Sequence, residues 1–208
     1  PEWKCTPRAY SLLATTVWPA SPFSATIFGV SASVNPLTAP AGGQGPFALW
    51  QYLVAAELEK IKEAGVKSAV ILAYNIREFT SLGRLKVVRS LMPIAQSAGI
   101  ENLLVDTCVI DVLTLGPACR TIYDVKNELG LPTGCGAHNA IGTWRGLKTK
   151  MGKQATHPSM ASACAIAIAA GANFLLYGPI DTASFIFPSV AMVDAAYAQL
   201  FREGGKKP

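Results

Sequence analysis

The sequence predicts an α/β fold built on a parallel sheet, and three observations support this prediction. Four mainly apolar runs have the length of strands and contain few charged residues, which is typical of strands that are buried on both faces. Each run follows a helical pattern that ends at a glycine, so the chain repeats one helix–glycine–strand unit four times. Polar residues gather directly after the strands, where a parallel sheet presents its functional side chains.

Length and composition agree with one well-packed domain. The chain has 208 residues, of which 50% are hydrophobic and 15% are charged, so it can bury a large core. The net charge is +5, but the 18 Lys and Arg residues are scattered and the densest group has only Trp144 beside it for stacking on bases. We therefore expect no nucleic-acid partner, and this group fits an anionic small molecule or an acidic protein. It consists of Arg145, Lys148, Lys150 and Lys153.

The cysteines and the apolar segments favour a cytoplasmic protein. Five cysteines without a CxxC pair predict neither a metal site nor a disulfide framework, so we expect them to be reduced and mostly buried. The apolar stretch at residues 161–177 is interrupted at Gly171, and each half is too short to cross a bilayer core of about 30 Å. No signal peptide is recognisable, and a first residue that is Pro1 rather than Met suggests a processed chain or a fragment.

The sequence divides into two parts. Residues 1–46 show no sustained periodicity and contain one candidate strand at residues 26–34, whereas residues 47–208 hold the repeated units. Helices are expected at residues 48–64, 84–98, 117–129, 158–170 and 187–201, and the first four end at Gly65, Gly99, Gly130 and Gly171. Strands are expected at residues 67–74, 102–106, 131–137 and 173–177. Pro117 is expected in the first turn of its helix, where a proline loses no hydrogen bond.

Parallel strands joined through helices form either an open doubly wound sheet or a TIM barrel. No GxGxxG sequence opens a helix after a strand, so a dinucleotide-binding sheet lacks support. Polar residues follow successive strands, at Asn75, Asp106, His138 with Asn139, and Gly178, as they do on the catalytic face of a barrel. Four or five strands cannot close an eight-stranded barrel of about 250 residues. We therefore interpret the chain as the C-terminal half to two-thirds of a (β/α)8 TIM barrel.

The most informative stretch is the hexapeptide GCGAHN at residues 134–139. Its two glycines allow a sharp turn and a close approach of the backbone to a ligand, and they deliver His138 and Asn139 to the end of the strand. A plain strand-to-helix turn, with Asn139 or Thr143 as the helix cap, explains the same residues. From the hexapeptide alone both interpretations stay open.

Five motifs in a fixed order carry a resemblance to a known family. They are LAYN at residues 72–75, LLVDT at 103–107, GCGAHN at 134–139, LYGPI at 176–180 and FPSVAMVDA at 187–195. Together they resemble the H-subunit family of tetrahydromethanopterin S-methyltransferase, which belongs to the pterin-dependent corrinoid methyltransferases. The resemblance covers roughly residues 57–200. Residues 140–144 depart from the family motif, although Trp144 keeps an aromatic side chain.

The resemblance implies a pterin-binding TIM barrel that moves a methyl group in methanogenesis or one-carbon metabolism. The methyl group would pass between N5 of a methyl-tetrahydropterin, either tetrahydromethanopterin or tetrahydrofolate, and the cobalt of a corrinoid. A partner protein or another component of a methyltransferase complex would carry this corrinoid, so the chain itself would hold no metal. The resemblance further implies a homodimer that does not span the membrane, located in the cytoplasm or at the surface of a membrane complex.

The same resemblance assigns roles to individual residues. Asn139 matches the asparagine beside pterin N5 and would be the catalytic residue, because an amide can donate or accept as the charge at N5 changes. Asp106 matches the pterin-binding aspartate, whose carboxylate can take the paired N–H groups of an aminopyrimidine edge. Asn75, Gly136 and His138 stand in matching motifs and would also line the pterin site.

Each assignment competes with a structural explanation. Asp106 would serve as a cap of the following turn, and His138 would be a satisfied core or turn histidine. An aldolase- or lyase-type barrel would need a lysine or metal ligands at the strand ends, but Lys67 lies at the start of its strand. A further alternative is an inactive partial barrel, or a binding subunit whose sheet edge pairs with another chain.

Overall fold

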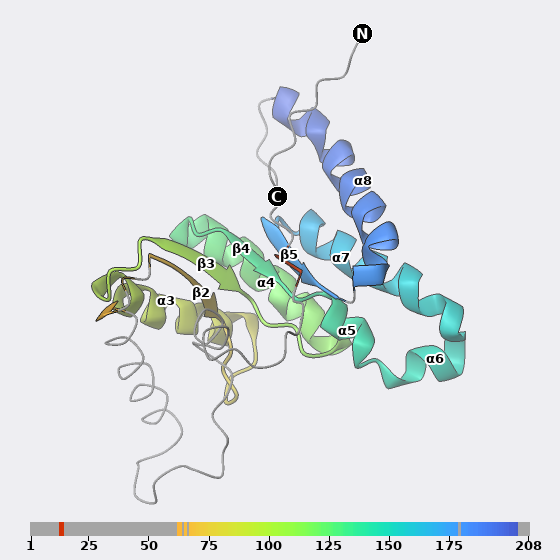
Figure 1. The fold of residues 1–208 in the computed structure, drawn as a ribbon, viewed down its shortest axis with the longest axis horizontal. Helices are drawn as coiled ribbons and strands as arrows, with labels where there is room; N and C mark the ends of the chain where they lie inside the picture. Colours follow the sequence, from red (N-terminus) through yellow and green to blue (C-terminus); the bar gives the residue numbers. More distant parts are fainter. Residues whose placement is uncertain (1–12, 15–61, 64, 66, 179, 204–208) are drawn as a thin grey trace, which may run out of the picture. The chain divides into compact units, whose positions relative to one another are not determined.

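The computed structural model describes residues 13–14, 62–63, 65, 67–178 and 180–203. The chain divides into two compact units (Figure 1). The smaller unit is Trp18–Asp106, and the larger unit combines Pro1–Val17 with Thr107–Pro208. The candidate strand at residues 26–34 and nearly all of the predicted helix at residues 48–64 lie outside the described residues. Only Lys62 and Glu63 of that helix are described, and both are helical.

The smaller unit contains one parallel β–α–β repeat. Strands β2, Ser68–Leu72, and β3, Asn102–Asp106, pair in parallel, and helix α3, Ser81–Ser97, connects them. The register places Leu72 opposite Asp106, so both strands end at the same level. Helix α3 begins three residues before the predicted start because the Thr80 hydroxyl accepts a hydrogen bond from the Gly83 amide at 3.0 Å.

The larger unit repeats the same arrangement with more helices between the strands. Strand β5, Phe174–Tyr177, pairs in parallel with β4, Thr133–Cys135, and with β1, Leu13–Ala14. The helices are α4, Val112–Leu129; α5, His138–Gly142; α6, Arg145–Met151; α7, Thr156–Ala169; and α8, Ala183–Arg202. Two short 3₁₀ turns cover Lys153–Ala155 and Ile180–Thr182. The parallel pairs in both units confirm the predicted α/β class.

The start of α4 corrects one prediction. The helix begins at Val112, five residues before Pro117, so the proline lies inside the helix and not in its first turn. The start is set by a reciprocal capping box: the Thr114 amide donates to Asp111 Oδ1, and the Asp111 amide donates to Thr114 Oγ1, both at 2.9 Å. The helix ends at Gly130 as predicted, with a φ of 66° that suits a glycine.

The other helix ends agree more closely with the sequence. Positive φ angles occur at all four glycines that were predicted to end helices, namely Gly65, Gly99, Gly130 and Gly171. Helices α7 and α8 begin two and four residues before their predicted starts, and α6 was not predicted. Among the described residues, no helix is both long and apolar enough to cross a membrane.

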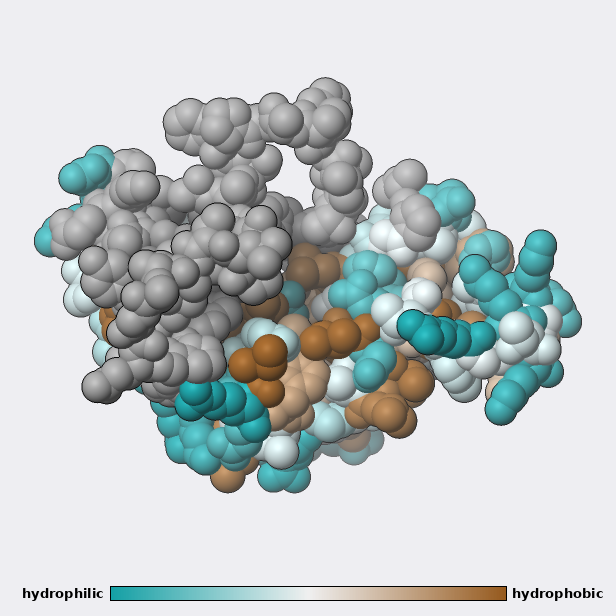
Figure 2. Space-filling view, turned by 90° about the horizontal axis from the view of Figure 1, so that it is seen from below, coloured by the Kyte–Doolittle hydropathy of each residue, from teal (hydrophilic) through white to brown (hydrophobic). Residues whose placement is uncertain are grey.

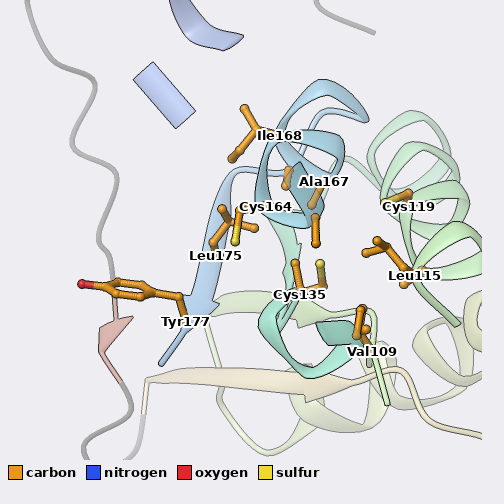
Figure 3. Packing of buried hydrophobic residues seen from close by; sticks show 14 of the residues in the cluster. Val109, Leu115, Cys119, Cys135, Cys164, Ala167, Ile168, Leu175 and Tyr177 are labelled. Atoms are coloured by element: carbon orange, nitrogen blue, oxygen red, sulfur yellow. The ribbon is translucent and has the colours of Figure 1, made fainter. Parts of the chain in front are cut away.

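The core of the larger unit lies between the strands and helices α4, α5 and α7 (Figure 3). Cys135 of β4 is fully buried, and in Figure 3 it lies among Leu175 of β5, Cys164 of α7 and Val109. Residue 134 has to be glycine, because a Cβ atom there would collide with the Phe174 carbonyl oxygen and lie 2.8 Å from the Phe174 ring. This close approach packs β4 directly against β5.

The cysteines that the structure describes are free thiols, as predicted. Cys119, Cys135 and Cys164 are buried, and Cys108 is half-buried. Burial raises the pKa of the Cys119 thiol to about 11 and that of Cys164 to about 12, because desolvation penalises the thiolate. These two side chains therefore remain neutral packing residues at ordinary pH. Cys5 lies outside the described residues.

Candidate functional site

The turn between β4 and α5 brings three of the predicted site residues together. Strand β4 ends at Cys135, α5 begins at His138, and the Asn139 amide closes the turn with a bond of 3.0 Å to the Gly136 carbonyl. A Cβ atom added at Gly136 would lie 3.1 Å from Asn139 Nδ2 and 3.7 Å from His138 Cε1. The side chains of Asn139 and His138 therefore both lie close to the buried Gly136.

Asn139 does not cap a helix. The N-cap position of α5 belongs to Ala137 and lacks a side-chain cap bond, so the cap interpretation is wrong for Asn139, whereas Thr143 is the C-cap residue of α5. The Asn139 side chain instead donates from Nδ2 to the Val109 carbonyl at 3.0 Å. This bond fixes the orientation of an exposed amide and leaves its Oδ1 atom as an acceptor for a ligand.

His138 is oriented by the neighbouring strand. Its Nδ1 atom lies 2.9 Å from the Leu176 carbonyl of β5, and this nitrogen carries the proton because a carbonyl oxygen only accepts. In the neutral ring, Nε2 is then the basic nitrogen that can accept a hydrogen bond or a proton. The ring is half-buried, so His138 is neither a fully enclosed core histidine nor a freely rotating surface residue.

The loop at residues 107–111 is held against this turn by the side chains of Thr107 and Thr143, for which the sequence did not predict this contact. The Thr107 amide and hydroxyl both donate to the Gly134 carbonyl, at 2.9 and 3.3 Å. The Thr143 hydroxyl donates to the Ile110 carbonyl at 3.0 Å. Between these anchors Cys108 adopts a φ of 58°, a left-handed conformation that costs a non-glycine residue about 1 kcal/mol or more.

Two further predicted residues lie in the smaller unit, at neighbouring strand ends. Asp106 is the last residue of β3, it is half-buried, and its carbonyl accepts a bond of 2.8 Å from the Ala73 amide just after β2. Asn75 lies two residues after Ala73, and its side-chain Oδ1 atom accepts hydrogen bonds from the Arg77 and Glu78 amides at 3.0 and 3.2 Å. Asn75 thus forms an Asx turn through its Oδ1 atom, and its Nδ2 group can donate to a ligand.

The segment of sequence that contains the β4–α5 turn carries charges of one sign. No Asp or Glu occurs anywhere in residues 129–180, a stretch that holds both histidines and four cationic residues. Within the residues that the structure describes, no group of three or more His, Cys, Asp and Glu side chains gathers. The turn itself offers an amide and an imidazole, which suit a polar ligand, and the four cationic residues follow it in the sequence.

Comparison with known proteins gives the family. The family model described as tetrahydromethanopterin S-methyltransferase MtrH subunit matches residues 51–208. The chain belongs to this family. The MtrH match confirms the resemblance that the strand-end motifs predicted, and it includes the whole β4–α5 turn.

Curated relatives carry the same family name. The H subunit of tetrahydromethanopterin S-methyltransferase from Methanosarcina acetivorans is 32% identical over 164 residues, which cover 72% of this chain and 52% of the relative. The proteins of that name from Methanothermobacter thermautotrophicus and Methanococcus maripaludis are 31% and 30% identical, and the matches cover 74% and 73% of this chain. The chain spans about half the length of these MtrH relatives, 53% and 54% for the last two.

Proposed function

We propose that this chain is a methyltransferase subunit that binds an N5-methyl-tetrahydropterin. It would transfer the methyl group of this pterin to the cobalt of a corrinoid on a partner protein. Membership of the MtrH family supports the transferase activity, and the relatives' name makes tetrahydromethanopterin the first substrate to test. The observation that carries the proposal is the orientation of Asn139. Its Nδ2 atom donates to the Val109 carbonyl, which leaves its Oδ1 atom as an acceptor for a ligand.

The chemistry requires a positive charge on N5. When the methyl group leaves, the carbon–nitrogen bond breaks and its electron pair stays on N5, so a proton on that nitrogen makes it a better leaving group. Asn139 Oδ1 would accept the hydrogen bond of the protonated nitrogen and stabilise this charge. The corrinoid supplies the nucleophile that takes the methyl group. His138 Nε2 would bind a polar group of the pterin, since Nδ1 is engaged with Leu176.

Asp106 and Asn75 supply the groups that suit the ring of the pterin. We propose that the Asp106 carboxylate accepts the N–H groups of the aminopyrimidine ring in charge-assisted bonds, with the Asn75 Nδ2 group as a further donor. In this proposal catalysis consists of positioning and charge stabilisation, and no side chain attacks the substrate.

We also propose that the β–α units at residues 47–208 form part of a TIM barrel with the ligand at the C-terminal ends of its strands. Each unit pairs consecutive strands in parallel with helices between them, which is the local pattern that a barrel repeats. A homodimer, in contact with other subunits of a methyltransferase complex, is the assembly that fits this proposal. An inactive remnant or a pure binding subunit would instead bind no pterin.

The proposal can be tested by methyl transfer to free cob(I)alamin, followed through the loss of its absorbance. We expect transfer from N5-methyl-tetrahydromethanopterin, with N5-methyl-tetrahydrofolate as the comparison substrate. Asn139→Ala should lower the rate about 100-fold or more, because a charge-stabilising contact is removed. Asn127→Ala is the matched control, since Asn127 is an exposed asparagine on α4, and it should stay within about twofold of the wild type. A folded chain that transfers from neither pterin would contradict the proposed reaction.

A further inference from the structure

The segment after α5 forms a basic arm, defined here as α6 with the 3₁₀ turn at Lys153–Ala155. Four cationic side chains lie on it and all four are exposed: Arg145, Lys148, Lys150 and Lys153. The arm lies inside the stretch of residues 129–180 that lacks any Asp or Glu. The ion pairs between described residues, such as that of Arg120 with Asp124, do not involve these four side chains. Their charge is therefore directed to the solvent.

The arm is firmly attached to the rest of the larger unit. Leu147 points into the core and is only 1% exposed, and Trp144 packs against the same cluster. In the helix, Arg145 and Lys148 are one turn apart on the side that faces away from Leu147. Figure 1 places α6 at the outer edge of the larger unit, beyond α5, and the corresponding end of Figure 2 is mostly hydrophilic. A partner would thus meet exposed charges on a segment that is anchored to the core.

We propose that the basic arm is a docking surface for an acidic surface of another protein. A single small anion would need donors that converge, whereas these four charges are spread along two short elements. A membrane-bound helix would present an apolar face, but α6 buries Leu147, and Met151 is its one exposed large apolar side chain. A nucleic acid would use stacking aromatics, and Trp144 is packed against the core. An extended acidic protein surface matches the observed charge pattern best.

The position of the arm gives this surface a role in the proposed function. Helix α5, which carries His138 and Asn139, ends at Gly142, three residues before α6 begins. A partner held by the arm would sit beside the residues that we propose to meet the pterin. Complementary charges raise association rates by about 10-fold to 1,000-fold at low salt. The docking itself does not depend on the methyl-transfer reaction, because it is measured without pterin or corrinoid.

The test uses the full chain and a fluorescent acidic peptide of about 20 residues rich in Glu and Asp, followed by fluorescence anisotropy. We expect binding that weakens at least about tenfold between about 50 and 300 mM NaCl. The double variant R145E/K148E should weaken binding at low salt at least about tenfold. The neutral variant R145Q/K148Q should also weaken peptide binding, but by less. It replaces the charge-reversed variant in the test if the charge reversal perturbs folding.

The matched control is K67E/K86E, which changes the net charge equally at two exposed lysines of the smaller unit. Its affinity for the peptide should lie within about twofold of the wild-type affinity. The docking surface is contradicted if R145E/K148E, folded by circular dichroism, binds the peptide as tightly as K67E/K86E does. It is also contradicted if the wild type prefers a duplex DNA of about 20 base pairs or phosphatidylserine vesicles to the peptide at equal salt.

Discussion

The side-chain amide of Asn139 donates a hydrogen bond of 3.0 Å to the backbone carbonyl of Val109, and this bond connects α5 to the loop before α4. Thr143 makes a parallel connection to Ile110 at 3.0 Å. One residue thus orients its own amide and helps to hold the loop in which Cys108 adopts its left-handed conformation. Substitution of Asn139 should therefore change stability as well as methyl transfer.

Asn139→Ala is expected to lower the free energy of unfolding by about 1 kcal/mol, the net value of one hydrogen bond. Asn139→Asp should cost more, because a carboxylate oxygen would then face the Val109 carbonyl. Urea denaturation measures both changes, with Asn127→Ala expected within about 0.5 kcal/mol of the wild type. If Asn139→Asp is as stable as the wild type, the Val109 bond is not formed in solution.

Gly136→Ala should impair ligand binding more than it impairs stability. The new Cβ would lie 3.1 Å from Asn139 Nδ2, so the amide must move by a few tenths of an ångström. We expect about tenfold weaker binding of the methyl-pterin, with a loss of stability of no more than about 1 kcal/mol. Gly142→Ala is the control, because a Cβ there meets no atom within 4 Å and should leave binding unchanged. Equal affinities for the two variants would show that the space beside Gly136 is not part of the site.

Gly134→Ala should be strongly destabilising. The added Cβ would collide with the Phe174 carbonyl and force β4 away from β5, which we expect to cost about 3 kcal/mol or more. Gly146→Ala offers the comparison, since its Cβ would make only ordinary contacts, the nearest at 3.7 Å to Trp144 Nε1, and alanine favours the helix by about 1 kcal/mol. Thermal unfolding separates the two. A Gly134→Ala protein as stable as the wild type would contradict the close β4–β5 packing.

Stability should fall at alkaline pH because of the buried thiols. The pKa of Cys119 is raised to about 11 and that of Cys164 to about 12, whereas a thiol in the unfolded chain titrates at about 8.5. As the pH rises, the unfolded chain therefore loses these protons first. The free energy of unfolding keeps its full value below about pH 8.5 and decreases as the pH rises above it. Between pH 8 and 9.5 each thiol should lower the free energy of unfolding by about 1 kcal/mol.

Urea denaturation at the two pH values measures this loss, and Cys119→Ala and Cys164→Ala provide the controls. Each variant removes one thiol, so the difference between its unfolding free energies at pH 8 and 9.5 should be about 1 kcal/mol smaller than that of the wild type. If both variants show the same pH dependence as the wild type, the two thiols ionise as readily in the fold as in the unfolded chain.

The sequence was sufficient for the features that depend on local signals. Strand β3 has the predicted bounds, and the glycines after α3, α4 and α7 end their helices, because apolar periodicity and left-handed caps act over a few residues. The start of α4 was misplaced because Pro117 was given more weight than Asp111, whose capping box uses Thr114 in place of the usual Glu or Gln.

The candidate site was predictable in its residues but not in its contacts. The strand-end motifs identified Asn139, His138 and Gly136, which the structure brings together at one turn. The partners of these residues, Val109 and Leu176, offer backbone carbonyls, and carbonyl acceptors have no sequence signature. The left-handed conformation of Cys108 was likewise unpredictable, because tertiary contacts of the loop impose it on a residue that does not favour it.

The most direct test of the account is calorimetric titration of the folded chain with N5-methyl-tetrahydromethanopterin and N5-methyl-tetrahydrofolate. We predict that one of them binds at a single site per chain. Asp106→Asn and Asn139→Ala should each weaken this binding at least about tenfold, which is about 1.4 kcal/mol, whereas Asp124→Asn and Asn127→Ala should not. Absence of binding by a folded chain, or equal binding by all four variants, would contradict a pterin site at these residues.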